Sequence, residues 1–222
     1  MKKRLLVFFL FVLVVPGSRL FAQEKIKQGK IIFEMIYPND SSGNKSSFGA
    51  FMKPKEKTFY FKNGNTRTET QTPIGKIISI YLAGTGETLS YSENSSQPFA
   101  MKTTRKDVEK LSLELGVDKP AIQITGETKK IAGIECKKAV VTYTNNKTYD
   151  AWFTEELDAF NSSEARFDGI NGFLMEFTSI GKGTTYTKCM SVEKISVPDT
   201  MFQLPPGYGI RTMDQIRNGE VH

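Results

Sequence analysis

Short runs of β-branched and aromatic residues alternate with Gly, Asn, Pro and Ser through most of the chain. Residues 57–62 are rich in aromatic side chains, and Asn63-Gly64-Asn65 follows as a tight-turn signal, because Asn and Gly tolerate positive φ angles. Residues 173–180 and 184–196 form a second predicted hairpin. Turn signals about every 8 to 12 residues are typical of antiparallel β-structure. We therefore expect roughly ten antiparallel strands joined by sequential hairpins.

One segment has helical rather than strand periodicity. Val108, Leu111 and Leu115 recur at the spacing of an apolar helix stripe, Thr104 is a suitable N-cap, and Gly116 stands where a C-terminal glycine is expected. This pattern predicts a helix over residues 105–115.

These elements together predict the fold class. A sheet of about ten strands usually curls or closes, so the expected fold is α+β and mainly antiparallel β: a strongly curved sheet with one or two helices against its concave face. No long Pro-, Ser- or Gly-rich linker divides the chain. We expect one domain over residues 23–222, ordered to about residue 210 with a frayed tail. Met201, Phe202 and Leu204 predict a buried closing segment despite the prolines around them.

The N-terminus has the composition of a secretory signal peptide. Lys2, Lys3 and Arg4 precede an apolar run at residues 5–15, and a short exit ends at Ala22. At about 1.5 Å per residue this run covers roughly 17 Å, which is short for a hydrocarbon core of about 30 Å. We predict cleavage of residues 1–22 and a soluble protein, periplasmic or secreted, with no membrane span.

Removal of the signal peptide changes the charge balance. The full chain carries a formal net charge of +6 from 30 basic and 24 acidic residues. Loss of Lys2, Lys3, Arg4 and Arg19 leaves 26 basic residues and a net charge of +2. The basic character therefore gives no support to a nucleic-acid partner.

The sequence lacks the residues that several kinds of catalytic site and metal site require. The only histidine is His222, the last residue, and no Cys-x-x-Cys motif is present, so histidine-based triads and zinc sites are not expected. Glu155 and Glu156 with Asp158 could form an acid–base pair, but a solvated first helical turn also explains them. We expect no catalytic residues, no metal, no cofactor and no enzymatic activity.

The two cysteines, Cys136 and Cys189, lie in strand-like patterns in the part of the chain that export would place in a disulfide-permitting compartment. We predict a disulfide between them. The alternative is a pair of unpaired core thiols on different strands, because the sequence does not show whether those strands adjoin.

Aromatic residues occupy both faces of two predicted strands, at Phe59-Tyr60-Phe61 and at Trp152-Phe153. A sheet with two apolar faces needs two covers, of which the predicted helix is one. The other is an apolar ligand, a partner or more of the protein, and ordinary core packing is the alternative to a ligand cavity. The residues expected to line such a cavity are Phe59, Phe61, Val108, Leu111, Leu115 and Trp152.

Four segments resemble a family of exported bacterial proteins, the domain-of-unknown-function 4412 type, which is similar to the lipoprotein carriers LolA, LolB and LppX. They are residues 59–67, 128–139, 149–154 and 197–208. The resemblance implies a half-barrel sheet that holds acyl chains against its helices. Lipid-anchored members need a cysteine at the mature N-terminus, and Gln23 stands here, so a lipoprotein is not expected.

The resulting functional hypothesis is a soluble extracytoplasmic binding protein that holds a lipid or another apolar molecule in a half-barrel cavity. The alternative is a non-enzymatic envelope interaction or assembly protein without a small ligand, whose partner would be an envelope protein. A hydrolase would need an Asp/Glu or Ser/Lys site, which the sequence does not reveal.

Overall fold

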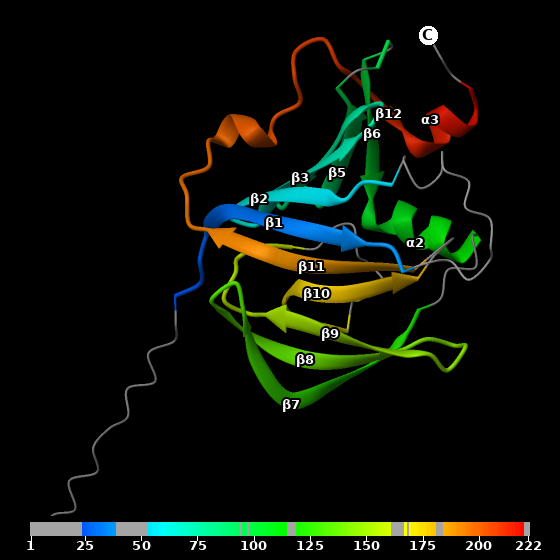
Figure 1. The fold of residues 1–222 in the computed structure, drawn as a ribbon. Coiled ribbons are helices and arrows are strands. Elements are labelled where there is room, and N and C mark those ends of the chain that lie inside the picture. Colours follow the sequence, from blue (N-terminus) through cyan, green and yellow to red (C-terminus); the bar gives the residue numbers. More distant parts are fainter. Residues whose placement is uncertain are drawn as a thin grey trace, which may run out of the picture.

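The computed structural model describes residues 24–38, 53–93, 95–96, 98–114, 119–160, 167, 169–180 and 184–219. A single sheet dominates this part of the chain (Figure 1). The predicted signal peptide, Leu115 and His222 lie outside the described residues.

Twelve strands of the described chain belong to this sheet. They are β1 (Gln28–Ile36), β2 (Glu56–Lys62), β3 (Asn65–Thr72), β4 (Gly75–Leu82), β5 (Glu87–Ser92), β6 (Phe99–Thr104), β7 (Ala121–Ile131), β8 (Ile134–Thr142), β9 (Thr148–Thr154), β10 (Phe173–Ile180), β11 (Thr184–Glu193) and β12 (Gly209–Thr212).

The strand order is β12-β6-β5-β4-β3-β2-β1-β11-β10-β9-β8-β7. Most neighbours are consecutive in sequence and antiparallel, as hairpin connections require. β1 lies between β2 and β11 and so joins the early and late halves of the chain. β12 pairs with β6 in parallel, which makes the sheet mixed rather than purely antiparallel.

Two of the hairpin turns have a positive φ angle at both central residues, a conformation that Asn and Gly tolerate but that is uncommon for Ala132. Asn63 and Gly64 between β2 and β3 have φ angles of 49° and 80°, and Ala132 and Gly133 between β7 and β8 have 48° and 82°. Two successive positive φ angles match the twist of the flanking strands. The tight turn predicted at Asn63-Gly64 is therefore confirmed.

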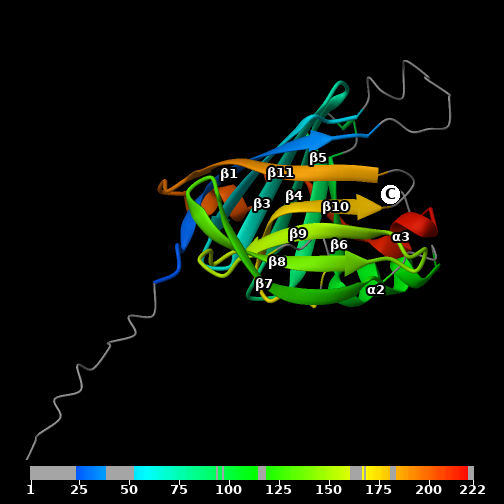
Figure 2. The ribbon, with the colours of Figure 1, turned by 60° about the horizontal axis from the view of Figure 1, so that its bottom comes forward.

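The sheet bends so that distant strands meet on one of its faces. Phe59 on β2 and Phe173 on β10 have ring centroids 4.9 Å apart, although β1 and β11 lie between these strands. In a flat sheet β2 and β10 would be about 14 Å apart, at about 4.8 Å per strand. The face that carries Phe59 is therefore the concave face, and β3–β6 pass behind β8–β11 at a steep angle (Figure 2).

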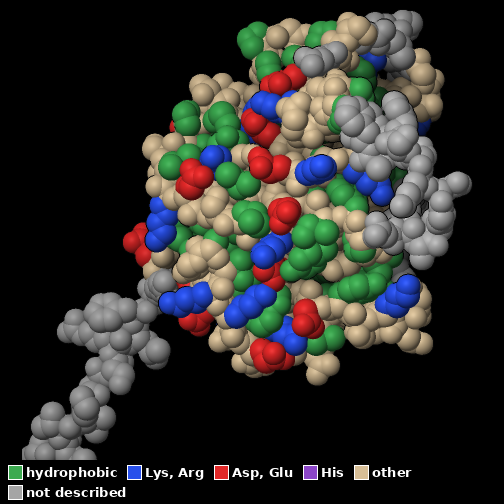
Figure 3. All heavy atoms as spheres, in the orientation of Figure 1, with side chains coloured by type: hydrophobic (Ala, Val, Ile, Leu, Met, Phe, Trp, Pro, Cys, Tyr) green, Lys and Arg blue, Asp and Glu red, His purple; other side chains and the backbone are tan. Residues whose placement is uncertain are grey.

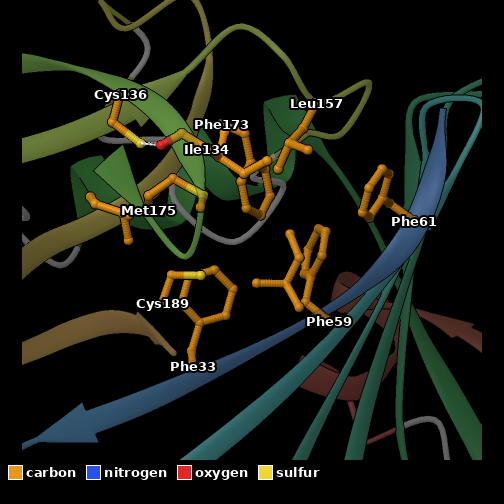
Figure 4. Packing of buried hydrophobic residues seen from close by; sticks show 11 residues of the cluster. Phe33, Phe59, Phe61, Ile134, Cys136, Leu157, Phe173, Met175 and Cys189 are labelled. Atoms are coloured by element: carbon orange, nitrogen blue, oxygen red, sulfur yellow. Dashed lines mark hydrogen bonds between the residues drawn. The ribbon is translucent and has the colours of Figure 1, made fainter. Parts of the chain in front are cut away.

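Where β1 and β2 face β7, β8, β10 and β11, a cluster of apolar side chains fills the concave face. Phe33, Phe59, Phe61, Phe173 and Leu157 point toward one another in Figure 4. Phe61 is 0% exposed and Phe173 1% exposed. Leu157 comes from the segment that follows β9, so a loop and not a helix completes this core.

The outer face of β4–β6 has its own apolar cluster, which the C-terminal segment covers. Ile78, Ile80 and Leu89 pack against Val197 and Phe202, and all five are buried. A 3-10 helix, η2 (Asp199–Phe202), carries Phe202. Of the residues predicted to form a buried closing segment, Phe202 is buried here, whereas Met201 and Leu204 are half-buried against the same cluster.

The predicted helix is present as α2 (Arg105–Glu114), and a short α3 (Met213–Arg217) follows β12. Thr104 caps α2, because its Oγ1 accepts a hydrogen bond from the amide of Asp107 at 3.3 Å. In return, the main-chain amide and hydroxyl of Thr104 donate to Asp107 Oδ2, each at 2.7 Å. However, no residue of α2 is buried, and it lies beside β6.

The predicted α+β class, with helices against the concave face, is therefore wrong. The described chain is sheet-dominated, and the apolar core of the concave face is made by strand side chains and the segment after β9, without a helix. The stripe of Val108 and Leu111 is only half-buried beside the edge of the sheet, which is too little apolar surface to cover it.

Candidate functional site

A pocket of about 490 Å³ lies between the start of α2 and the chain that connects β9 to β10. Its size falls in the range of small-ligand sites. It is lined by Lys25, Arg105, Glu155, Leu157, Asp158, Ala159, Phe160, Phe167, Ile170, Asn171, Gly172 and Leu174.

The lining divides into a floor and a rim. Leu157, Phe167, Ile170 and Leu174 are buried and form an apolar floor. Charged and amide side chains, which are exposed except for the half-buried Asp158, form the rim: Lys25, Arg105, Glu155, Asp158 and Asn171. A ligand that fits this pocket has both an apolar surface and several hydrogen-bonding groups.

Backbone pairing holds one wall of the pocket. Ile26 forms an isolated parallel bridge with Leu157. The amide of Ile26 donates to the carbonyl of Glu156 at 2.7 Å, and the amide of Asp158 donates back to the carbonyl of Ile26 at 2.9 Å. This pairing places Lys25 and Asp158 on the same wall.

A close approach of two backbones fixes the opposite wall. A Cβ atom at Gly172 would lie 2.6 Å from Phe153 Cδ2 and 2.7 Å from the carbonyl oxygen of Thr154. Only glycine fits at that distance. Gly172 thereby brings Asn171 and Leu174 against the end of β9.

An aromatic pair links the pocket to the concave face of the sheet. Phe160, 42% exposed, packs against Tyr81 of β4 with ring centroids 4.8 Å apart and an angle of 36° between the ring planes. At the rim, Glu155 pairs with Lys137 at 2.8 Å and Arg105 pairs with Glu109 at 3.1 Å. The rim cations and carboxylates are therefore partly neutralised but remain accessible.

The residues predicted to line a cavity do not meet at this pocket. Phe59 and Phe61 are buried in the core of the concave face, whereas Val108 and Leu111 are half-buried on α2. Leu115 lies outside the described residues.

Trp152 packs against that core with Lys129 over its ring at 4.3 Å. Lys138 lies 6.0 Å from the same ring and pairs with Glu127 and Asp150, each at 3.1 Å. Figure 3 shows a face on which basic and acidic side chains lie next to each other. Trp152 is thus packed between the core and charged side chains and does not line the pocket.

Both cysteines are free thiols in the structure, so the predicted disulfide is not formed there. Both are buried in the concave core, in agreement with the alternative of core thiols. Burial raises the pKa of Cys136 and of Cys189 from an ordinary 9.0 to about 12. Such thiols are weak nucleophiles.

Sequence reasoning considered Glu155 and Asp158 but missed Lys25, Arg105, Phe160 and Asn171. These residues come from four separate places in the chain, and no spacing rule joins them. The closely spaced glycines at positions 169 and 172 could have indicated this site, because such glycines often mark a close approach of two backbones.

None of the helices in the described part of the chain is long and apolar enough to cross a membrane. In that same part of the chain no group of three or more His, Cys, Asp and Glu side chains is placed to hold a metal ion.

Comparison with known proteins gives one family and one fold. The family model "N-glycanase peptide, N-terminal domain" matches residues 46–206. Two solved structures of PNGF-II, in the C2 and P21 space groups, have TM-scores of 0.52 and 0.53 and are each 14% identical. They cover 87% and 86% of this chain, which spans 32% of their length. No curated protein matches the chain.

These matches correct several expectations. The resemblance to the 4412-type and LolA-like carriers is wrong, because the matching family is a different one. The predicted lipid-binding function and lipid partner depended on that resemblance and are therefore wrong as well. The expectation of a non-enzymatic protein is also corrected, because the matching family model is that of the N-terminal domain of an N-glycanase.

Proposed function

We propose, on the premise that this chain belongs to the N-glycanase peptide, N-terminal domain family, that it takes part in the enzymatic release of N-glycans. In this proposal the glycan of a glycoprotein substrate occupies the pocket between α2 and the β9–β10 connection. Because the chain spans about a third of the PNGF-II structures, the proposal concerns its share in that activity, which is substrate binding.

The observation that supports a sugar ligand is the division of the pocket into apolar floor and polar rim. A sugar ring presents C–H groups on its faces and hydroxyl or acetamido groups at its edge. The buried floor side chains suit the ring face. The rim carboxylates accept hydrogen bonds from hydroxyl groups, and Lys25, Arg105 and Asn171 donate to sugar oxygens.

The aromatic wall adds a surface of the same character. Phe160 keeps 42% of its surface exposed even though it packs against Tyr81. An exposed ring at the mouth of a polar pocket offers a flat apolar platform for a sugar face. An acyl chain would contact only the apolar floor and would form no hydrogen bonds with the rim.

The proposed substrate also agrees with the predicted export. N-linked glycoproteins are found mainly outside the cytoplasm, where a signal peptide at residues 1–22 would deliver the chain. Export remains part of the proposal.

Binding of N,N′-diacetylchitobiose, the sugar pair attached to asparagine in N-glycans, tests the proposal by NMR titration or calorimetry. Phe160→Ala should weaken binding about tenfold through loss of the ring platform. Ile124→Ala is the matched control, because Ile124 on β7 is 51% exposed and does not line the pocket. Absence of binding by the unmodified chain, or equal losses in both variants, would overturn the proposal.

A further inference from the structure

The concave face of β3–β5 carries hydroxyl groups where the neighbouring strand carries aromatic rings. Cross-strand partners share a face of a sheet. Phe59 pairs with Thr68 and Phe61 with Thr66 across β2 and β3. The series then continues on the same face through Ser79 and Tyr81 of β4.

The next strand extends the pattern. Ser79 pairs with Ser90, and Tyr81 with Thr88, across β4 and β5. Thr66, Thr68, Ser79, Tyr81, Thr88 and Ser90 therefore form one patch, which we call the hydroxyl region. All except the buried Thr66 are only half-buried.

This arrangement reverses the usual distribution of polar and apolar residues between the two faces of a bent sheet. The inward face is ordinarily the apolar one, because it is the easier face to cover. In β4 and β5 the apolar residues instead point outward, where Ile78, Ile80, Leu89 and Tyr91 lie beneath the C-terminal segment. The inward face is thus left polar, although it faces the interior of the fold.

The hydroxyl groups in this region keep unused hydrogen-bonding capacity. Ser79 Oγ and Ser90 Oγ lie 2.9 Å apart, so their mutual bond uses one donor and one acceptor site. The two hydroxyl groups together therefore keep one donor and several acceptor lone pairs for other partners. Thr66, 1% exposed, has no partner for its Oγ1.

The hydroxyl region is continuous with the pocket. Tyr81 belongs to the region, and Phe160 lines the pocket, and their ring centroids lie 4.8 Å apart. A ligand that lies on the Phe160 ring can therefore extend over Tyr81 toward Ser79 and Ser90.

We infer that the hydroxyl region is a second saccharide-binding surface, which holds the outer sugars of a branched N-glycan whose innermost sugars occupy the pocket. This inference rests on the proposed function. Neutral hydroxyl groups in a row, next to an aromatic pair, match outer sugars that are neutral and rich in hydroxyl groups. A phosphate or an acidic ligand would require cations, and the six residues of the region are uncharged.

The test compares two ligands with the same protein: N,N′-diacetylchitobiose, and a glycopeptide that carries a complete branched N-glycan. The double variant Ser79→Ala/Ser90→Ala removes the central hydroxyl pair. We expect it to weaken glycopeptide binding about tenfold and to leave chitobiose binding unchanged.

Thr142→Ala/Thr148→Ala is the matched control, because Thr142 and Thr148 are also a cross-strand hydroxyl pair, on β8 and β9, far from Tyr81 in the strand order. It should change neither affinity. Equal unfolding midpoints would show that the variants are folded.

The outcomes separate the two proposals. Undiminished glycopeptide binding by the Ser79/Ser90 variant, with chitobiose still bound, would overturn the second surface and leave the pocket proposal standing. Failure of the unmodified chain to bind either ligand would overturn both.

Discussion

Two neighbouring parts of the concave face use the same strand geometry for opposite purposes. In the aromatic region, made by Ile31, Phe33, Phe59, Phe61 and Phe173, ring side chains from both halves of the sheet meet and exclude water. One strand further, from β3 onward, the same face becomes the hydroxyl region. The change occurs between directly paired residues such as Phe61 and Thr66.

The difference follows from the cover that each part has. The aromatic region is covered by strands that fold back over it. The strands β4 and β5 instead bury their outer face beneath Val197, Phe202 and Tyr208 of the closing segment. A strand that has its apolar cover on the outside does not need one on the inside, and its inner face is free to serve a polar ligand.

Truncation in the aromatic region should give the largest loss of stability. Phe173 is 1% exposed and contacts both Phe33 and Phe59. Phe173→Ala should lower the free energy of unfolding by about 3–5 kcal/mol, because it leaves a cavity where the two halves of the sheet meet. Urea denaturation measures this loss. Phe160→Ala, at an exposed ring, should cost less than about 1 kcal/mol, and similar losses for the two would contradict the packing described.

Adjacent residues of β4 test the reversal of faces directly. Ile80 is 0% exposed on the outer face, whereas Ser79 is half-buried on the inner face. Ile80→Ala should cost about 2–5 kcal/mol. Ser79→Ala should cost about 1 kcal/mol or less, since it loses one hydrogen bond to Ser90. A larger loss at Ser79 than at Ile80 would mean that the inner face is the core face.

These two residues also show where sequence reasoning stops. The alternation Ile78, Ser79, Ile80, Tyr81 identifies a strand with one apolar face, because the period of a strand is local. It does not tell which face turns inward. That choice depends on Val197 and Phe202, which are more than one hundred residues away in sequence.

The candidate site was less predictable for the same reason. The turn at Asn63-Gly64 and the cap at Thr104 depend on a few consecutive residues, and both were predicted. The pocket requires the bridge between Ile26 and Leu157 and the approach of Gly172 to Thr154. Such contacts follow from strand order, which the sequence pattern leaves open.

A smaller loss is expected at Gly172, which lines the pocket and precedes Phe173 of the aromatic region in the sequence. The Cβ atom of Gly172→Ala would lie 2.7 Å from the carbonyl oxygen of Thr154, so a backbone must move. The free energy of unfolding should fall by about 1–3 kcal/mol, as for other overpacked sites. Gly169→Ala is the control, because its Cβ would meet only the side chain of Ile122, at 3.2 Å. Equal effects at the two glycines would contradict a tight β9–β10 approach.

The smallest effect is expected at the start of α2, which directly follows β6 and lies outside both the aromatic region and the hydroxyl region. No residue of α2 is buried, so loss of its cap should disturb neither region. Thr104→Ala should cost about 1 kcal/mol, as for other N-cap hydroxyls. Ser112→Ala, within the same helix, is the control and should be close to neutral.

The cap also predicts a pH dependence. Hydrogen bonds from the backbone amide and the hydroxyl of Thr104 lower the pKa of Asp107 below its ordinary value of 3.8. A lowered pKa stabilises the folded protein above the unfolded value, and this contribution is lost as the pH falls through the folded value. The difference between the parent chain and Thr104→Ala should therefore be constant near neutral pH and shrink below about pH 4. Urea midpoints from pH 7 to pH 3 measure it. A loss of several kcal/mol at neutral pH would instead make α2 the cover of the concave face, and the hydroxyl region would then be part of the core.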